Sequence, residues 1–169
     1  DNANNLVVVG RTYSINFPVT PNAYDVSQNG GADFTVTKFN TTGTALVGST
    51  YLGGTGDDVV NGTAVETAFV DLKYNYGDDA RSEVIVDGAG NIILASVTQS
   101  EDFRTTAGSF QALPGNKTTT RFQDGILVKL TPNLDAVIFS SFLGGGDDDA
   151  AFVLAINPLT GFIYVAGAT

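Results

Sequence analysis

An internal repeat constrains the fold of this chain more than any other feature of its sequence. The segment Asn5–Thr12 resembles Asn91–Thr98, and both resemble Phe162–Thr169, at spacings of 86 and 71 residues. Self-similarity of this kind is typical of proteins that stack copies of one supersecondary unit. The sequence therefore predicts a series of similar units.

Other parts of the unit recur in the same order, which locates the differences between copies. The matched pairs are 17–24 with 103–110, 33–39 with 124–130, and 49–54 with 140–145. The first pair lies 86 residues apart and the other two lie 91 apart, so the second copy carries five additional residues near 116–120.

A second difference brings both spacings to one length. Gly56-Asp57-Asp58 reappears 21 residues later as Gly77-Asp78-Asp79, and 86 − 21 = 65. The spacing of 71 residues contains the five additional residues near 116–120 and one extra residue in the turn near Pro158. Without these six residues it becomes 71 − 6 = 65. One unit of about 65 residues therefore explains both spacings.

Each unit is predicted to contain four β-strands joined by turns. The complete copy offers strands at 83–87, 91–98, 125–130 and 136–142, and 87–91 suits a tight hairpin turn. Val, Ile and Phe are frequent in these segments, as expected for half-buried strands, and no segment has a helical period. A further candidate strand, 66–72, lies between the two Gly-Asp-Asp segments.

Four-stranded sheets of this kind are expected to pack on one another, because one such sheet cannot bury both of its faces. Blades around a central axis are a common solution. The predicted fold is all-β: a partial β-propeller of four-stranded antiparallel blades, about two and a half in number. Residues 1–54 are assigned to a partial blade, 55–76 to an insertion, 77–145 to a complete blade and 146–169 to the start of a third. Since part-blades cannot close a ring, we expect further blades or domains in a longer parent chain.

Several motifs of the unit match a known repeat family. They are Tyr51-Leu-Gly-Gly54 followed by Gly-Asp-Asp, Asp87-Gly-Ala-Gly-Asn91, Phe17-Pro-Val-Thr20, and Asp124 ahead of a strand that ends in Lys129. Together they resemble the bacterial SBBP-type β-propeller repeat, over nearly the whole chain except about 55–76. The resemblance implies a secreted or surface-anchored protein of bacteria or archaea, often large and modular. It implies no reaction, because no catalytic residues are established for the repeat.

The charge and composition argue against several functions. Asp and Glu number 18 against 8 Lys and Arg, a net charge of −10, which would repel nucleic acid and anionic membrane surfaces. No apolar stretch approaches the roughly 18 residues of a membrane helix, so no membrane insertion is expected. Cys and His are absent, which excludes the usual zinc sites and Ser-His or Cys-His nucleophile pairs. These absences favour a protein that is not an enzyme.

Three acidic loops are the candidate metal sites. Carboxylates clustered on Gly-rich loops suit a hard cation such as calcium. The alternative is that Gly supplies backbone freedom and Asp accepts hydrogen bonds from turn N–H groups. No other cofactor is expected. The residues concerned are Asp57, Asp58, Asp78, Asp79, Asp147, Asp148 and Asp149.

Asp33 and Asp124, with Lys38 and Lys129 at matched positions, are interpreted as structural. A catalytic carboxylate–lysine pair would not be expected to recur in every unit. The repetition favours a hydrogen bond at the start of the strand and an exposed lysine stem.

Aromatic side chains provide the remaining candidates. The loops 17–24 and 103–110 are interpreted as packing between consecutive blades, with stacking on sugar rings as the alternative. Tyr74 and Tyr76 lie in the insertion, which the repeat does not require, and loops of this kind carry function. They are therefore candidate ligand contacts.

The sequence is compatible with three functions. The first is a non-catalytic secreted or cell-surface module, acting as a spacer or as a scaffold for adhesion and recognition of a surface glycan or protein. The second is a polysaccharide-active enzyme that uses Asp or Glu, since paired carboxylates cleave glycosides without His. The third is an assembly subunit whose open sheet edges pair with another chain.

Overall fold

The computed structural model describes residues 1–61, 80–115 and 123–169, and these form an all-β fold without helices. No segment of this described part is therefore a helix capable of crossing a membrane. The strands are β1 (Leu6–Thr12), β2 (Asp33–Phe39), β3 (Leu46–Leu52), β4 (Glu83–Val86), β5 (Ile92–Thr98), β6 (Asp124–Leu130), β7 (Val137–Leu143), β8 (Ala150–Ile156) and β9 (Ile163–Ala168).

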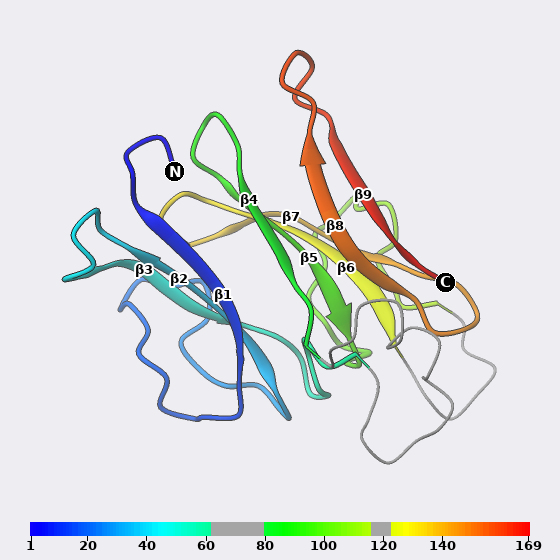
Figure 1. The fold of residues 1–169 in the computed structure, drawn as a ribbon. Helices are drawn as coiled ribbons and strands as arrows, with labels where there is room; N and C mark the ends of the chain where they lie inside the picture. Colours follow the sequence, from blue (N-terminus) through cyan, green and yellow to red (C-terminus); the bar gives the residue numbers. More distant parts are fainter. Residues whose placement is uncertain (62–79, 116–122) are drawn as a thin grey trace.

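The strands form three antiparallel sheets in chain order. The first sheet is β1-β2-β3, the second is β4-β5-β6-β7 and the third is β8-β9. Figure 1 shows them side by side, from the blue and cyan first sheet to the orange and red third. The strands expected at 83–87, 91–98, 125–130 and 136–142 are confirmed to within a residue as β4 to β7. The expected strand at 66–72 lies outside the described residues.

Strand pairing repeats between the first two sheets. β1 pairs with β2 so that Thr12 is opposite Asp33, and β5 pairs with β6 so that Thr98 is opposite Asp124. The next pairing shifts register after Lys38 in one sheet and after Lys129 in the other. The repeat read from the sequence is thus also a repeat of hydrogen-bond register.

The turns before β1, β5 and β9 share one backbone feature. Asn4, Gly90 and Gly161 all have positive φ, at 60°, 85° and 72°. They occupy the same place in the repeat, being 86 and 71 residues apart. Asn and Gly are the residues that adopt this left-handed conformation most readily, which explains their place in the turn.

The main core lies between the first and second sheets. Phe34 and Val36 of β2 join Ile126 and Val128 of β6 in one buried cluster. Phe103, from the loop after β5, packs edge-on against both Phe34 and Phe142 with ring centroids 6.3 Å apart in each pair. Its position agrees with the packing interpretation of this aromatic loop, although Phe110 at the other end of the loop is 83% exposed.

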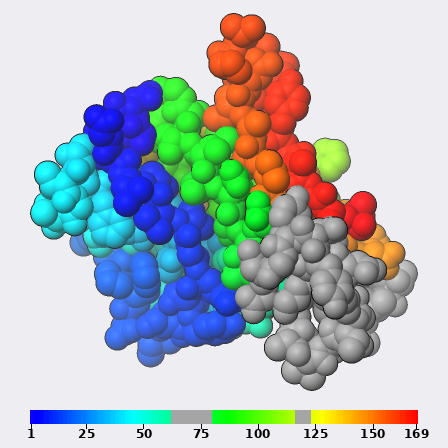
Figure 2. Space-filling view, viewed as in Figure 1, coloured from blue at the N-terminus to red at the C-terminus, as the bar shows by residue number. Residues whose placement is uncertain are grey.

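The third sheet packs on the opposite face of the second. Ile93 and Ala95 of β5 form a smaller buried cluster with Ala151 and Leu154 of β8. The far end of the β8–β9 hairpin projects beyond the rest of the molecule in Figure 2, and Leu159 in its turn is 94% exposed. The molecule therefore has one well-filled interface between sheets and one that is filled only in part.

Candidate functional site

The site considered first is the pair of acidic loops that join successive sheets. The first acidic loop, residues 53–58, follows β3, and the second acidic loop, residues 144–149, connects β7 to β8. Backbone hydrogen bonds connect the first loop to both neighbouring sheets: Asp58 N donates to Ala32 O, and Gln99 N donates to Asp57 O at 2.8 Å. The loop is therefore the place where the chain passes from one sheet to the next.

The Asp58 carboxylate is fully buried at this crossing. It accepts hydrogen bonds from Gly54 N at 2.9 Å, from Ser100 Oγ at 3.0 Å and from the Thr98 hydroxyl. Gly54 belongs to the acidic loop, whereas Thr98 ends β5 and Ser100 follows it. One side chain thus connects the loop to the second sheet.

Asp33, at the start of β2, lies beside the same loop and is also fully buried. Its Oδ2 accepts a hydrogen bond from Asn29 N at 2.8 Å, and its Oδ1 is buried without a hydrogen-bond partner within the described structure. A Cβ on Gly53 would lie 2.7 Å from both Asp33 Oδ1 and Asp58 Oδ2. The two carboxylates therefore converge on a position that only glycine can occupy.

The second acidic loop repeats the loop-glycine and backbone contacts 91 residues later. Asp149, the counterpart of Asp58, accepts a hydrogen bond from Gly145 N at 2.6 Å, and its own N–H donates to Gln123 O at 3.0 Å. Asp124, the counterpart of Asp33, accepts a hydrogen bond from Gly115 N at 2.7 Å. A Cβ on Gly144 would lie 2.1 Å from Asp124 Oδ1. The arrangement is thus a property of the unit and recurs at each junction.

Burial perturbs the acidity of both carboxylates in the first loop. Loss of hydration raises the pKa of Asp58 to about 7, against the opposing effect of its three hydrogen bonds. Burial also raises the pKa of Asp33, assisted by the negative charge of Asp25. Neither carboxylate faces solvent, so their chemistry is that of internal hydrogen-bond acceptors.

The predicted metal ligands that the structure describes do not gather into one cluster. In the described part of the chain, no three acidic side chains form a group that could hold a metal ion. Asp57 is half-buried and accepts a hydrogen bond from Ala32 N, Asp148 is half-buried, and Asp147 is exposed. Asp78, Asp79, Tyr74 and Tyr76 lie outside the described residues. The calcium hypothesis and the ligand-contact hypothesis both remain predictions.

A second repeated contact joins the lysines to the turns. Lys38 Nζ lies 2.8 Å from Asp1 Oδ2, and Lys129 Nζ lies 2.8 Å from Asp87 Oδ2. The prediction of an exposed lysine stem is wrong for Lys38, which is only 5% exposed. Lys38 is buried because it lies between Asp1 and the Pro132 carbonyl, to which its Nζ donates a hydrogen bond.

The hydrogen bonds of Asp87 determine its acidity. Burial alone would raise its pKa, but hydrogen bonds from Lys129 and Asn91 outweigh burial and lower the pKa to about 2. Sequence reasoning missed the roles of Asp1 and Asp87. Their 86-residue spacing, equal to that of the turns they belong to, could have revealed them.

Comparison with known proteins does not assign the chain to a family. No protein-family model matches the chain, and no curated protein matches it significantly. The resemblance to the SBBP-type repeat thus stays a prediction from the motifs.

Proposed function

We propose that this chain is a non-catalytic module of a secreted or cell-surface β-propeller, serving as a structural spacer or as a scaffold for adhesion and recognition. The repetition of the junction chemistry carries this proposal. Asp58 and Asp149 each accept a hydrogen bond from a loop glycine N–H, and each donates its own N–H to a carbonyl just before the matching strand. A contact set that recurs at every junction is what a structural joint requires.

The arrangement of the sheets supports the proposal that each sheet is a blade of a propeller. The second sheet has four antiparallel strands, the number typical of a propeller blade, and it packs against a neighbouring sheet on each face. The structure shows the sheets stacked on one another, and their arrangement around a central axis is part of the proposal. The extracellular location rests on the resemblance to SBBP-type repeats.

Burial of the paired carboxylates favours this function over that of a polysaccharide-active enzyme. Glycosidases place two carboxyl groups on either side of a sugar that enters an open cleft. Asp33 and Asp58 are adjacent but fully buried, and their counterpart Asp124 is fully buried as well. A polysaccharide could not reach these pairs without separation of the sheets.

The direct test is an assay for turnover. The purified chain is incubated with a panel of polysaccharides, and newly formed reducing ends are measured against a heat-denatured control. We expect no release above that control. Release that disappears in the Asp57→Asn variant, whose carboxylate is more accessible than that of Asp58, would replace this proposal with the enzymatic one.

Calcium binding by the acidic loops needs its own experiment. Because Asp58 and Asp149 already accept backbone hydrogen bonds, we expect calcium to leave the melting temperature unchanged relative to magnesium. A calcium-specific rise in melting temperature that the Asp147→Asn substitution abolishes would make the second acidic loop a metal site.

A further inference from the structure

Loops of the chain itself cover the outer edges of the first two sheets. β3 and β7 are edge strands, since each pairs with only one other strand among the described elements. The edge loops, residues 17–25 and 103–111, form hydrogen bonds with these strands. Ser49 at the middle of β3 and Ser140 at the middle of β7 are fully buried as a result. Uncovered strand edges are templates for pairing with another chain, so the covering has a consequence for self-association.

One threonine in each edge loop satisfies both outward backbone groups of the edge serine. Thr20 N donates to Ser49 O at 3.0 Å, and Ser49 N donates to Thr20 Oγ1 at 3.2 Å. In the second sheet, Thr106 N donates to Ser140 O at 3.1 Å, and Ser140 N donates to Thr106 Oγ1 at 3.0 Å. Paired residues of an antiparallel ladder exchange two hydrogen bonds through backbone groups alone. The threonine hydroxyl therefore takes the place of a backbone carbonyl.

The carbonyl of each threonine is used in a turn. Ala23 N donates to Thr20 O at 3.0 Å, and Ser109 N donates to Thr106 O at 3.1 Å. A hydrogen bond between residues three apart is that of a β-turn, which reverses the chain. Each edge loop therefore pairs with the edge at its threonine and then turns, so that it does not add a further regular strand to the sheet.

A second backbone contact fixes the end of each edge loop two residues further along the edge strand. Tyr51 N donates to Asp25 O at 3.1 Å, and Phe142 N donates to Gln111 O at 3.1 Å. Asp25 and Gln111 have the same place in the repeat, 86 residues apart, although their side chains differ. The repeat thus keeps the backbone contact while the side chain changes, which indicates that covering the edge is what matters.

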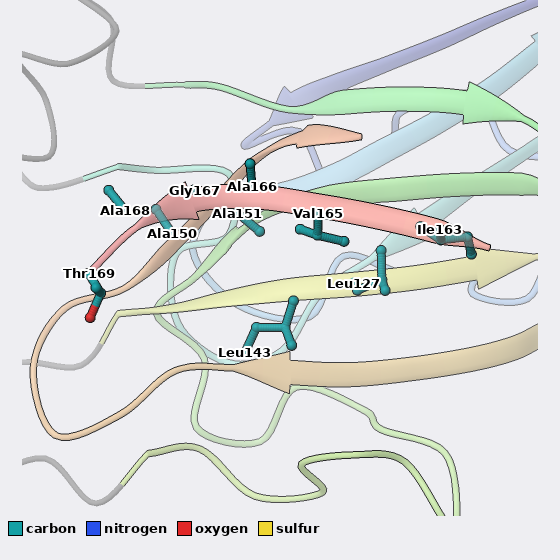
Figure 3. Close-up of a pocket in the computed structure, with 10 residues that line it drawn as sticks. All are labelled: Leu127, Leu143, Ala150, Ala151, Ile163, Val165, Ala166, Gly167, Ala168 and Thr169. Atoms are coloured by element: carbon teal, nitrogen blue, oxygen red, sulfur yellow. The ribbon is translucent and has the colours of Figure 1, made fainter. Parts of the chain in front are cut away.

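The faces of the sheets are used differently from these edges. Leu127 of β6 and Leu143 of β7 lie on the face directed at the third sheet. Together with Ile163 and Val165 of β9 they line an apolar groove of about 430 Å³ (Figure 3). Packing between sheets thus uses their faces, and the outer edges of β3 and β7 are left to the edge loops.

We propose that Thr20 and Thr106 are edge-capping residues, whose loops prevent the outer edges of β3 and β7 from pairing with a second copy of the chain. Each covered edge accepts extended backbone, and the same edge of a second copy fits it, because an antiparallel pair of identical strands is two-fold symmetric. The inference goes beyond the proposed function, since it concerns self-association and not recognition or turnover.

The test is a double variant, Thr20→Val with Thr106→Val. Valine keeps the size of threonine but offers no acceptor to the N–H groups of Ser49 and Ser140. We expect self-association, followed by sedimentation velocity over a range of concentrations, to be at least about tenfold stronger than in the wild type. A folded double variant that associates no more strongly than the wild type would overturn the inference.

Two control variants show whether the edge hydroxyls are responsible. Thr131→Val removes a hydroxyl that accepts hydrogen bonds from Asp135 N and Ala136 N, both at 3.2 Å, in an exposed turn away from the edge loops. It should associate like the wild type, as should Thr20→Ser with Thr106→Ser, which keeps both hydroxyls. Equal association of Thr131→Val and the double valine variant would contradict a role of the edges.

A rescue experiment separates edge pairing from aggregation of unfolded chains. Val47 of β3 and Ile138 of β7 have side chains that are 40% and 49% exposed. Lysine on an edge strand opposes pairing between edges. Adding Val47→Lys and Ile138→Lys to the double valine variant should restore the association behaviour of the wild type. Association that persists would mean that it does not arise at these edges.

Hydrogen exchange of the wild type provides a measurement that does not depend on the folding of any variant. After correction for sequence, the amides of Ser49 and Ser140 should exchange at least about tenfold more slowly than that of Gly88, which lies in an exposed turn. Exchange of both serine amides at the rate of Gly88 would show that the edges are open and would overturn the inference.

Discussion

At the scale of single residues, Asp58 shows how a carboxylate can serve the fold from inside the core. Its oxygens accept hydrogen bonds from the loop that leaves the first sheet and from hydroxyls of the second sheet. Loss of hydration opposes its ionisation and raises its pKa to about 7. The same group that joins the sheets therefore makes their association sensitive to pH.

We expect the chain to lose stability as pH rises from about 4 to about 7 because of Asp58. The unfolded chain releases this proton near the ordinary pKa of 3.8, whereas the folded chain keeps it up to about 7. Over this window the folded state binds more protons, so the free energy of unfolding falls with pH, by at most about 4 kcal/mol. Urea denaturation of wild type and Asp58→Asn at several pH values measures the difference, and the variant should have the flatter profile.

Asp135→Asn supplies the control for an Asp-to-Asn substitution away from the junction. Asp135 is exposed in the turn between β6 and β7, so this variant replaces an aspartate without touching the sheet junction. Identical pH profiles for the two variants would show that Asp58 is not the source of the slope.

Gly53 should tolerate no side chain. The Cβ of Gly53→Ala would lie 2.7 Å from Asp33 Oδ1 and from Asp58 Oδ2, forcing two buried carboxylates apart. Overpacking of this kind costs about 1–3 kcal/mol of unfolding free energy. Gly88→Ala is the control, because its Cβ would meet no atom within 4 Å. Chemical denaturation of both variants tests this, and equal stabilities would contradict the described junction.

Asp87 should respond to pH in the direction opposite to Asp58. Its pKa is lowered to about 2, so its contribution to stability is present above the ordinary pKa of 3.8 and is lost as pH falls from there towards 2. Lys129→Met should move the Asp87 titration, followed by carboxyl NMR shifts, upward towards 3.8. The accompanying loss of stability should be under about 1 kcal/mol, because solvent screens this partly exposed pair. An unchanged titration would mean that the lysine does not set the acidity of Asp87.

At the scale of elements, the aromatic loop after β5 joins two sheets through one side chain. Phe103 contacts Phe34 and Phe142, so its truncation would open a cavity at the centre of the main core. Phe103→Ala should lower the free energy of unfolding by about 3–5 kcal/mol. Phe110→Ala, in the same loop but 83% exposed, should change it by less than about 0.5 kcal/mol. Urea denaturation distinguishes these values, and a small effect at Phe103 would refute its packing role.

The strands could be predicted from the sequence because each unit appears more than once. A spacing of 91 residues between Asp33 and Asp124 already implies that both begin equivalent strands, as β2 and β6 do. The hairpin turn at 87–91 could be predicted as well, since Gly tolerates the positive φ that Gly90 adopts there.

The role of Asp58 could not be predicted in the same way. It depends on Thr98 and Ser100, which are about 40 residues away and become neighbours only when the sheets pack. Likewise, the burial of Lys38 requires the Pro132 carbonyl from the second sheet. Sequence patterns report local structure and repetition, whereas burial and acidity depend on contacts between units.

At the scale of the whole molecule, the structure is a stack of three sheets in which both junctions share the loop-glycine and backbone contacts of an aspartate. The first interface is filled by apolar side chains from both sheets, and the second leaves the groove beside β9 open. A repeated stack of this kind gains stability both from each sheet and from the interfaces between neighbouring sheets.

The most direct test of this account is an NMR experiment on the isotopically labelled chain that detects proximity between side-chain protons. The central claim is that consecutive sheets pack face to face around Phe103. The account predicts nuclear Overhauser effects from the Phe103 ring to Phe34 of the first sheet and to Phe142 of the second, because both ring pairs have centroids 6.3 Å apart. Contacts from Phe103 to the second sheet alone would mean that the sheets do not stack as described and would contradict the account.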